Sequence, residues 1–167
     1  MKQECSVMEQ PAQIAAVIDQ LARGPALVRQ VIYDVPPELR KRRPAPGMWS
    51  AHEHAVHLPA IYPLIVRRLE QMLNERAPHI KSYEPSRDEP DDALLALDLD
   101  TEMDRFGRER AALIERLRNL TPDQWAITAT HDEYSHYGVF IMFRHIALHD
   151  LHHAYKIEER LLRKDWA

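Results

Sequence analysis

The sequence predicts an all-α fold, a four-helix bundle with long crossover connections. Apolar residues recur at intervals of three and four along four long segments, which is the spacing of one helix face. No segment shows a convincing alternation of apolar and polar residues, and the 167 residues include only 4 glycines. The length is ordinary for one domain. We therefore expect a single domain over residues 1–167, with its core at about 10–162.

The first helical segment lies upstream of a proline-rich linker. Pro11 is placed for the first turn of a helix, which Gly24-Pro25 should interrupt because proline lacks the N–H that a helix needs. A shorter helical piece is expected over residues 26–32.

The second helix begins at a sequence that is typical of a capping box. Ser50 is the expected N-cap and Glu53 the partner three residues later, and the pattern runs to about Arg76. Pro59 falls inside this pattern and should bend the helix. The polar segment 78–90 is long enough to carry the chain away to a helix that is not its neighbour.

The third and fourth helices complete the predicted bundle. Asp91-Asp92 favours a helix start through the helix dipole, and the helical pattern continues, with room for one break, to Leu117. Thr121-Pro122 predicts an N-cap followed by proline at the first position of a short turn. The last long helix should span about 138–162 and is apolar on two faces, which predicts a homodimer contact.

Composition excludes several classes of function. The chain has 22 Lys plus Arg against 26 Asp plus Glu, a formal charge of −4, so we expect no nucleic-acid partner. No apolar run approaches the length of a membrane span and no signal peptide is evident, so we expect no membrane association and a cytoplasmic location. The single cysteine, Cys5, leaves histidine and carboxylate as metal ligands.

Two separated groups of histidines predict a metal site. His149 and His153 are four residues apart, so both imidazoles stand on one helix face and can bind one cation. A catalytic site needs a third protein ligand from another element, which the upstream group can supply. On a straight helix His54 lies nearer the centre of the apolar stripe than His57 does, so this spacing leaves the third ligand open.

Several motifs in a fixed order resemble those of a known family. The chain resembles the DinB-like (DinB/YfiT) metalloenzymes over roughly residues 10 to 162. The motifs are Pro46-Gly47-Met48-Trp49-Ser50 followed by His57, then Leu120-Thr121-Pro122-Asp123-Gln124-Trp125, His131 and Gly138, then His149-Asp150-Leu151-His152-His153-Ala154-Tyr155-Lys156-Ile157.

This resemblance implies a four-helix bundle, often dimeric, with one divalent transition metal, nickel or zinc, bound by three histidines from two helices. Matched to the motifs, the ligands are His57, His149 and His153. The chain departs from the family pattern at His54, where an apolar side chain is usual, and at Lys156, where glutamine is common.

The remaining polar residues have expected roles around this site. His54, His145 and His152 are expected in the pocket or behind the ligands, and Glu53 is either a catalytic base or the capping-box acid. Four other histidines are expected to be structural or solvent-facing: His52, His79, His131 and His136.

Two functions remain as hypotheses. The first is a metalloenzyme that activates water or a thiol cosubstrate for hydrolysis or transfer on a small molecule. The alternative is a non-catalytic metal-binding or stress-response dimer. An open coordination position favours the enzyme, and a closed shell with a fourth protein ligand favours the structural role.

Overall fold

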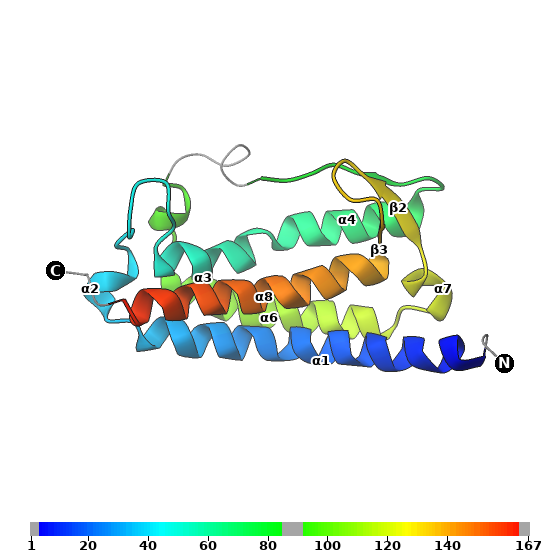
Figure 1. The fold of residues 1–167 in the computed structure, drawn as a ribbon, viewed down its shortest axis with the longest axis horizontal. Coiled ribbons are helices and arrows are strands. Elements are labelled where there is room, and N and C mark those ends of the chain that lie inside the picture. Colours follow the sequence, from blue (N-terminus) through cyan, green and yellow to red (C-terminus); the bar gives the residue numbers. More distant parts are fainter. Residues whose placement is uncertain (1–3, 85–91, 164–167) are drawn as a thin grey trace.

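The protein is described by a computed structural model that covers residues 4–84 and 92–163. Four helical rods lie side by side along the long axis (Figure 1). They are α1 (Glu4–Asp34), α3 (Ala51–Ala60) continued by α4 (Tyr62–Asn74), α6 (Leu99–Arg118) and α8 (Val139–Leu161). The first and last rods run in one direction and the two middle rods in the other, so a long crossover separates α4 from α6. The predicted all-α bundle is confirmed.

Short elements close the ends of the bundle. They are α2 (Pro37–Arg40), the 3₁₀ helix η1 (Leu94–Ala96), α7 (Pro122–Trp125) and three strands, β1 (His79–Ile80), β2 (Thr128–His131) and β3 (Tyr137–Gly138). The strands lie in the order β1-β2-β3, the first pair parallel and the second antiparallel. The sequence predicted no strand, and this was wrong because strands of two to four residues are too short to show alternation.

Helix α1 is unbroken through Gly24-Pro25, which corrects the predicted interruption. Proline has no N–H to donate to the carbonyl four residues earlier, here that of Leu21. Arg110 Nη1 of α6 donates to this carbonyl over 3.0 Å and replaces the lost helical bond. The helix also begins at Glu4, well before Pro11, so the predicted first turn was placed too late.

The second rod confirms the predicted capping box and bend. The Ser50 hydroxyl accepts from the Glu53 N–H, and the Glu53 carboxylate accepts from the Ser50 N–H. One helix ends at Ala60 and the next begins at Tyr62, directly after Pro59. The start of the rod is therefore fixed by local hydrogen bonds and its break by proline.

The start of the third helix was predicted too early. Asp92 has a φ of 62°, which no right-handed helix allows, and Asp91 lies outside the described residues. The N-cap is Asp98, whose side chain accepts from the Thr101 N–H over 2.9 Å. The predicted cap at Thr121 is confirmed, with Pro122 in the first helical turn of α7.

A polar layer divides the core of the bundle. One apolar cluster includes Leu21 and Leu113, and the other includes Val28 and Phe106. Between them Arg110 of α6 forms a buried ion pair with Asp150 of α8, and Gly24 of α1 packs against the carboxylate, where a Cβ atom would collide. Asp150 thus holds the side chain of Arg110 in place.

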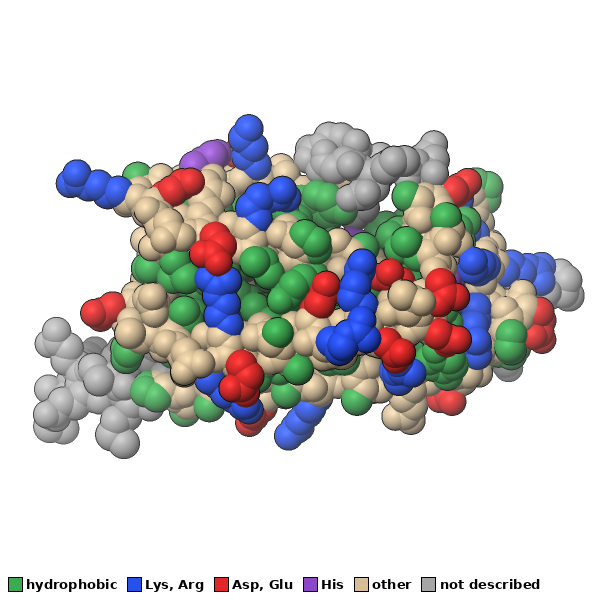
Figure 2. Space-filling view, turned by 180° about the vertical axis from the view of Figure 1, so that it is seen from behind, with side chains coloured by type: hydrophobic (Ala, Val, Ile, Leu, Met, Phe, Trp, Pro, Cys, Tyr) green, Lys and Arg blue, Asp and Glu red, His purple; other side chains and the backbone are tan. Residues whose placement is uncertain are grey.

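The surface carries both signs of charge. On the face seen in Figure 2, acidic and basic side chains are interspersed between apolar ones, and neither sign gathers into a large patch there. Within residues 4–84 and 92–163, no helix has the length and apolar character to cross a membrane.

Candidate metal centre

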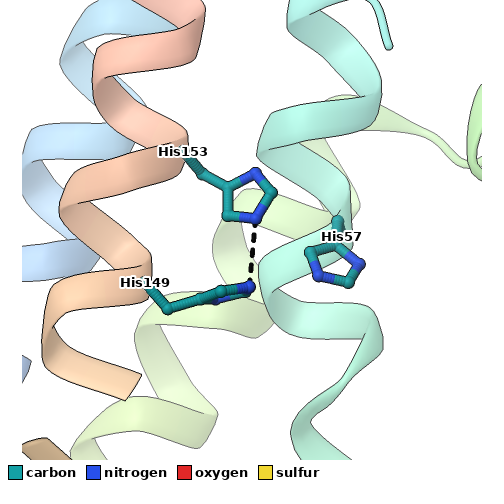
Figure 3. Close-up of side chains that lie close together, drawn as sticks. All are labelled: His57, His149 and His153. Atoms are coloured by element: carbon teal, nitrogen blue, oxygen red, sulfur yellow. Dashed lines mark hydrogen bonds between the residues drawn. The ribbon is translucent and has the colours of Figure 1, made fainter. Parts of the chain in front are cut away.

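Three imidazoles from two helices converge inside the bundle. Figure 3 shows His149 and His153 on α8 and His57 facing them from α3. One ring nitrogen from each lies within 4.8 Å of the others, and the Nε2 atoms of His149 and His153 are 3.1 Å apart. The i, i+4 spacing that places two of these rings on one face is local. The third ring joins them because α3 packs against α8.

Burial keeps these imidazoles neutral. Burial, together with the neighbouring histidines, lowers the pKa of His57 to about 3 and that of His149 to about 4. The pKa of His153 is shifted in the same direction for the same reasons. A neutral imidazole has one nitrogen lone pair free for a metal. Near pH 7 the cluster is therefore a set of three neutral imidazoles.

The cluster fits a tetrahedral cation. Metal–nitrogen bonds of about 2.0–2.1 Å place two ligand nitrogens roughly 3.3 Å apart at tetrahedral angles, close to the observed 3.1 Å between His149 and His153. The ligand atoms of all three lie within 4.8 Å of one another, so His57 would have to approach the other two to match. The Nδ1 atom of His149 is buried and has no protein partner among the described residues. The donor set and its spacing agree with a divalent metal held by nitrogen.

His54 lies behind the cluster and contacts it through His153. Their Nδ1 atoms are 2.9 Å apart, so one of these nitrogens carries a hydrogen and the other accepts it. If His153 used Nε2 as a ligand, its Nδ1 would carry the hydrogen and His54 would accept it. Hydrogen bonds of this kind orient ligand imidazoles in metal sites. His54 is 8% exposed, and burial lowers its pKa to about 3.

A cavity of about 340 Å³ adjoins the imidazoles. Its wall contains the three clustered histidines together with Trp49, whose ring centroid lies 4.9 Å from that of His57 and 5.9 Å from that of His153. In the sequence Trp49 is part of the motif that precedes His57. The structure places its indole beside the imidazoles of His57 and His153, on the wall of the cavity.

Two predicted pocket histidines, His145 and His152, line this cavity and are exposed. The ring centroids of His145 and His149 are 6.3 Å apart, and burial followed by the charge of Arg68 lowers the pKa of His145. His131, which was expected to be structural or solvent-facing, also lines the cavity. His131 belongs to the motif that carries the family resemblance, but only the tertiary structure shows that the short strand β2 brings it to the cavity.

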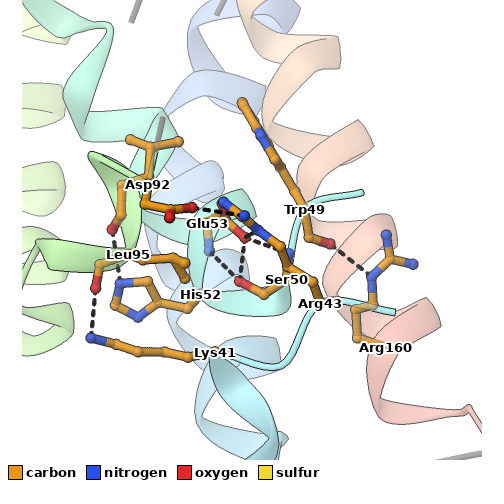
Figure 4. A network of polar contacts seen from close by, with 10 residues as sticks. Lys41, Arg43, Trp49, Ser50, His52, Glu53, Asp92, Leu95 and Arg160 are labelled. Atoms are coloured by element: carbon orange, nitrogen blue, oxygen red, sulfur yellow. Dashed lines mark hydrogen bonds and ion pairs between the residues drawn. The ribbon is translucent and has the colours of Figure 1, made fainter. Parts of the chain in front are cut away.

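Glu53 is not among the residues that line this cavity and belongs to a separate polar network (Figure 4). Its carboxylate is 1% exposed and accepts from Ser50 over 2.8 Å and from Arg43 over 3.0 Å. Burial alone would raise the pKa of Glu53, but the Arg43 and Ser50 hydrogen bonds lower it below its usual value. Both oxygens are committed to the capping box and the ion pair, so the geometry favours the structural role over that of a base.

Comparisons with known proteins agree with this architecture. The profile of the DinB superfamily matches residues 20–157. No curated protein matches the chain significantly. Among solved structures, one similar fold is that of YfiT from Bacillus subtilis, described as a probable metal-dependent hydrolase with an unusual four-helix bundle topology. The TM-score is 0.78 at 20% identity, over 92% of this chain and 89% of that chain. At this identity the likeness supports the fold alone.

Proposed function

Because this chain belongs to the DinB superfamily and gathers three neutral imidazoles beside a cavity, we propose that it is a metal-dependent enzyme. In this proposal His57, His149 and His153 bind one divalent transition metal, zinc or nickel, since imidazole suits both. The substrate is a small molecule, because the cavity of about 340 Å³ is at the lower end of ligand pockets.

The observation that carries the proposal is that all three imidazoles line the cavity. Structural metal sites are closed by four protein ligands, whereas catalytic sites keep a position for water or substrate. No Cys, Asp or Glu joins the three histidines as a fourth ligand in the part of the chain that the structure describes. The arrangement is therefore better suited to catalysis than to a purely structural or stress-response role.

Hydrolysis is the reaction that we propose first. A divalent cation in this site would lower the pKa of a water or of a cosubstrate thiol placed in the open position. His145 lies on the cavity wall one turn before His149, and its lowered pKa keeps the imidazole free to accept a proton. We assign His145 as the base that takes the proton of the attacking water. Thiol transfer is the alternative, and it would not need this base.

Metal analysis of the purified protein, after removal of any histidine tag, tests the ligand set. We expect close to one divalent metal per chain in the wild type and its loss in His57→Ala and His153→Ala. His152→Ala is the matched control, because this exposed neighbour should leave the metal in place. Circular dichroism verifies that each variant is still helical. Metal content that His153→Ala leaves unchanged would refute the assignment.

Activity separates the enzyme from the non-catalytic alternative. Metal-loaded protein should hydrolyse members of a panel of small amides and esters, and chelation should abolish this turnover. His145→Gln should retain the metal but lose most of the rate, since a general base contributes about 10² to 10⁴-fold. Full metal occupancy without turnover on any substrate of the panel would favour the binding protein.

We also propose that residues 1–167 form one cytoplasmic domain that assembles as a homodimer through the outer face of α8. Leu148 and Tyr155 on this face are 58% and 62% exposed. Exposed apolar residues that gather on one helix face mark interaction surfaces. Sedimentation analysis should give a dimer for the wild type and a monomer for Leu148→Glu. A wild-type monomer at micromolar concentration would contradict the dimer.

A further inference from the structure

Arg68 lies on the wall of the same cavity, away from the imidazoles. It follows His57 by eleven residues along the α3–α4 rod, about 16 Å along the axis at the usual helical rise. Helical side chains lean toward the N-terminus of their helix, which brings the guanidinium nearer to the cluster than its Cα is. Both residues line the same cavity.

The guanidinium of Arg68 is held in place but is not neutralised. Its Nη2 donates to the Lys81 carbonyl over 2.6 Å, and the Tyr137 hydroxyl is a second partner, which leaves further N–H groups of its five for a ligand. No ion pair joins it to any carboxylate in residues 4–84 and 92–163. Among the residues that the structure describes, Arg68 is also the one Lys or Arg that lines the cavity. Arg68 therefore supplies the positive charge on this wall of the cavity.

Aromatic rings stand beside this charge. The ring of His131 lies 4.7 Å from that of Tyr134 and 4.5 Å from that of Tyr137, measured between centroids, and the two tyrosine rings are stacked. Burial raises the pKa of Tyr137, whose hydroxyl interacts with Arg68. A protonated hydroxyl beside a guanidinium supplies a second hydrogen-bond donor for an anion. The three rings offer a surface against which the apolar part of a ligand can pack.

We propose that this end of the cavity binds the carboxylate of a small organic monoanion. A guanidinium matches a carboxylate with two parallel hydrogen bonds. One unpaired cation with Glu133 on the same wall suits a single negative charge better than a phosphate dianion. The orientation that we assign to the substrate, with its reacting group at the imidazoles, rests on the proposed function. The carboxylate site itself is independent of the proposed function.

A series of monohydroxamic acids, HO₂C–(CH₂)n–CONHOH, tests both ends at once. In zinc-loaded protein the hydroxamate should bind at the histidines and the carboxylate should reach Arg68 at one best chain length. There the acid should bind roughly 10-fold or more tightly than its methyl ester, as expected for a charged hydrogen-bonded pair. Calorimetry of Arg68→Gln should lose this difference, and Arg67→Gln, the exposed neighbour, should keep it.

A second probe separates this inference from the metal assignment. In protein stripped with a chelator, 3-phenylpropionate should bind more tightly than 3-phenylpropionamide, and Arg68→Gln should remove the preference. This result would support the carboxylate site even if no hydroxamate bound. Equal affinity for the acid and amide, or a preference that survives in Arg68→Gln, would overturn it. Tighter binding of 2-phenylethylphosphonate than of the carboxylate would overturn the monoanion assignment.

Discussion

Replacement of Arg110 by Met should destabilise the bundle more than any exposed charge change. The side chains of Arg110 and Asp150 are 4% and 1% exposed, and they form two hydrogen bonds, the longer being 3.1 Å. Arg110 also donates to the Leu21 carbonyl that Pro25 leaves without a helical donor. One substitution therefore removes the partner of a buried charge and of a buried carbonyl.

The magnitude follows from these two losses. Removing one member of a buried ion pair costs about 3–5 kcal/mol, because the remaining charge is uncompensated. An unsatisfied carbonyl adds about 1–3 kcal/mol. Together they approach the whole stability of a typical domain, about 5–15 kcal/mol. Arg110→Met/Asp150→Leu removes both charges and keeps the branched shape at position 150. The double variant should retain only the cost of the Leu21 carbonyl.

Urea denaturation followed by far-ultraviolet circular dichroism measures the free energy of unfolding. Arg116→Met is the matched control on the same helix, since the Arg116–Glu70 pair is 35% and 48% exposed and should cost less than about 1 kcal/mol. We expect the order Arg116→Met, double variant, Arg110→Met from most to least stable. The reasoning is refuted if Arg110→Met matches its control, or if the double variant is no more stable than Arg110→Met.

Three further predictions concern the site. His54→Leu should weaken zinc affinity about 10 to 100-fold, measured by competition with a chelating dye, because it removes the acceptor that orients His153; unchanged affinity would argue against this role. In metal-free protein the free energy of unfolding should fall from pH 6.5 toward pH 4 by about 1.4 kcal/mol per pH unit for each buried imidazole. Over this range the unfolded chain binds protons at His57 and His149 that the folded chain excludes, so a stability that is flat from pH 7 to pH 5 would contradict their burial as neutral groups. Glu53→Gln should lower stability by about 1–3 kcal/mol and leave metal content and turnover intact, because its carboxylate caps a helix; loss of turnover with normal stability would instead restore the catalytic role.

Local sequence patterns predicted one part of the histidine cluster and left another part open. The spacing of His149 and His153 was enough to place both on one helix face. The choice between His54 and His57 was not settled by the helical wheel, because it depends on where α8 lies. In the structure both contact His153, but from different sides: His57 shares the cavity, whereas His54 meets the far ring nitrogen.

Some residues left a signal that could have been used. Arg110 stands four residues after Phe106 and three before Leu113, a position that belongs to the apolar stripe of α6. A charged residue at such a position requires a buried partner, and Asp150 on the last helix is that partner. Arg68, by contrast, follows a regular amphipathic pattern and looks like any solvent-facing arginine.

The sequence by itself determined that four long helical segments form, the caps at Ser50 and Thr121, the break after Pro59 and the pairing of His149 with His153. All of these depend on contacts within a few residues, where helical geometry is fixed. Only the tertiary structure decided that α1 passes through Gly24-Pro25, that Glu53 faces Arg43, and that Arg68 shares a cavity with the imidazoles. These features depend on groups far apart in the chain, and their positions are set by how the helices pack.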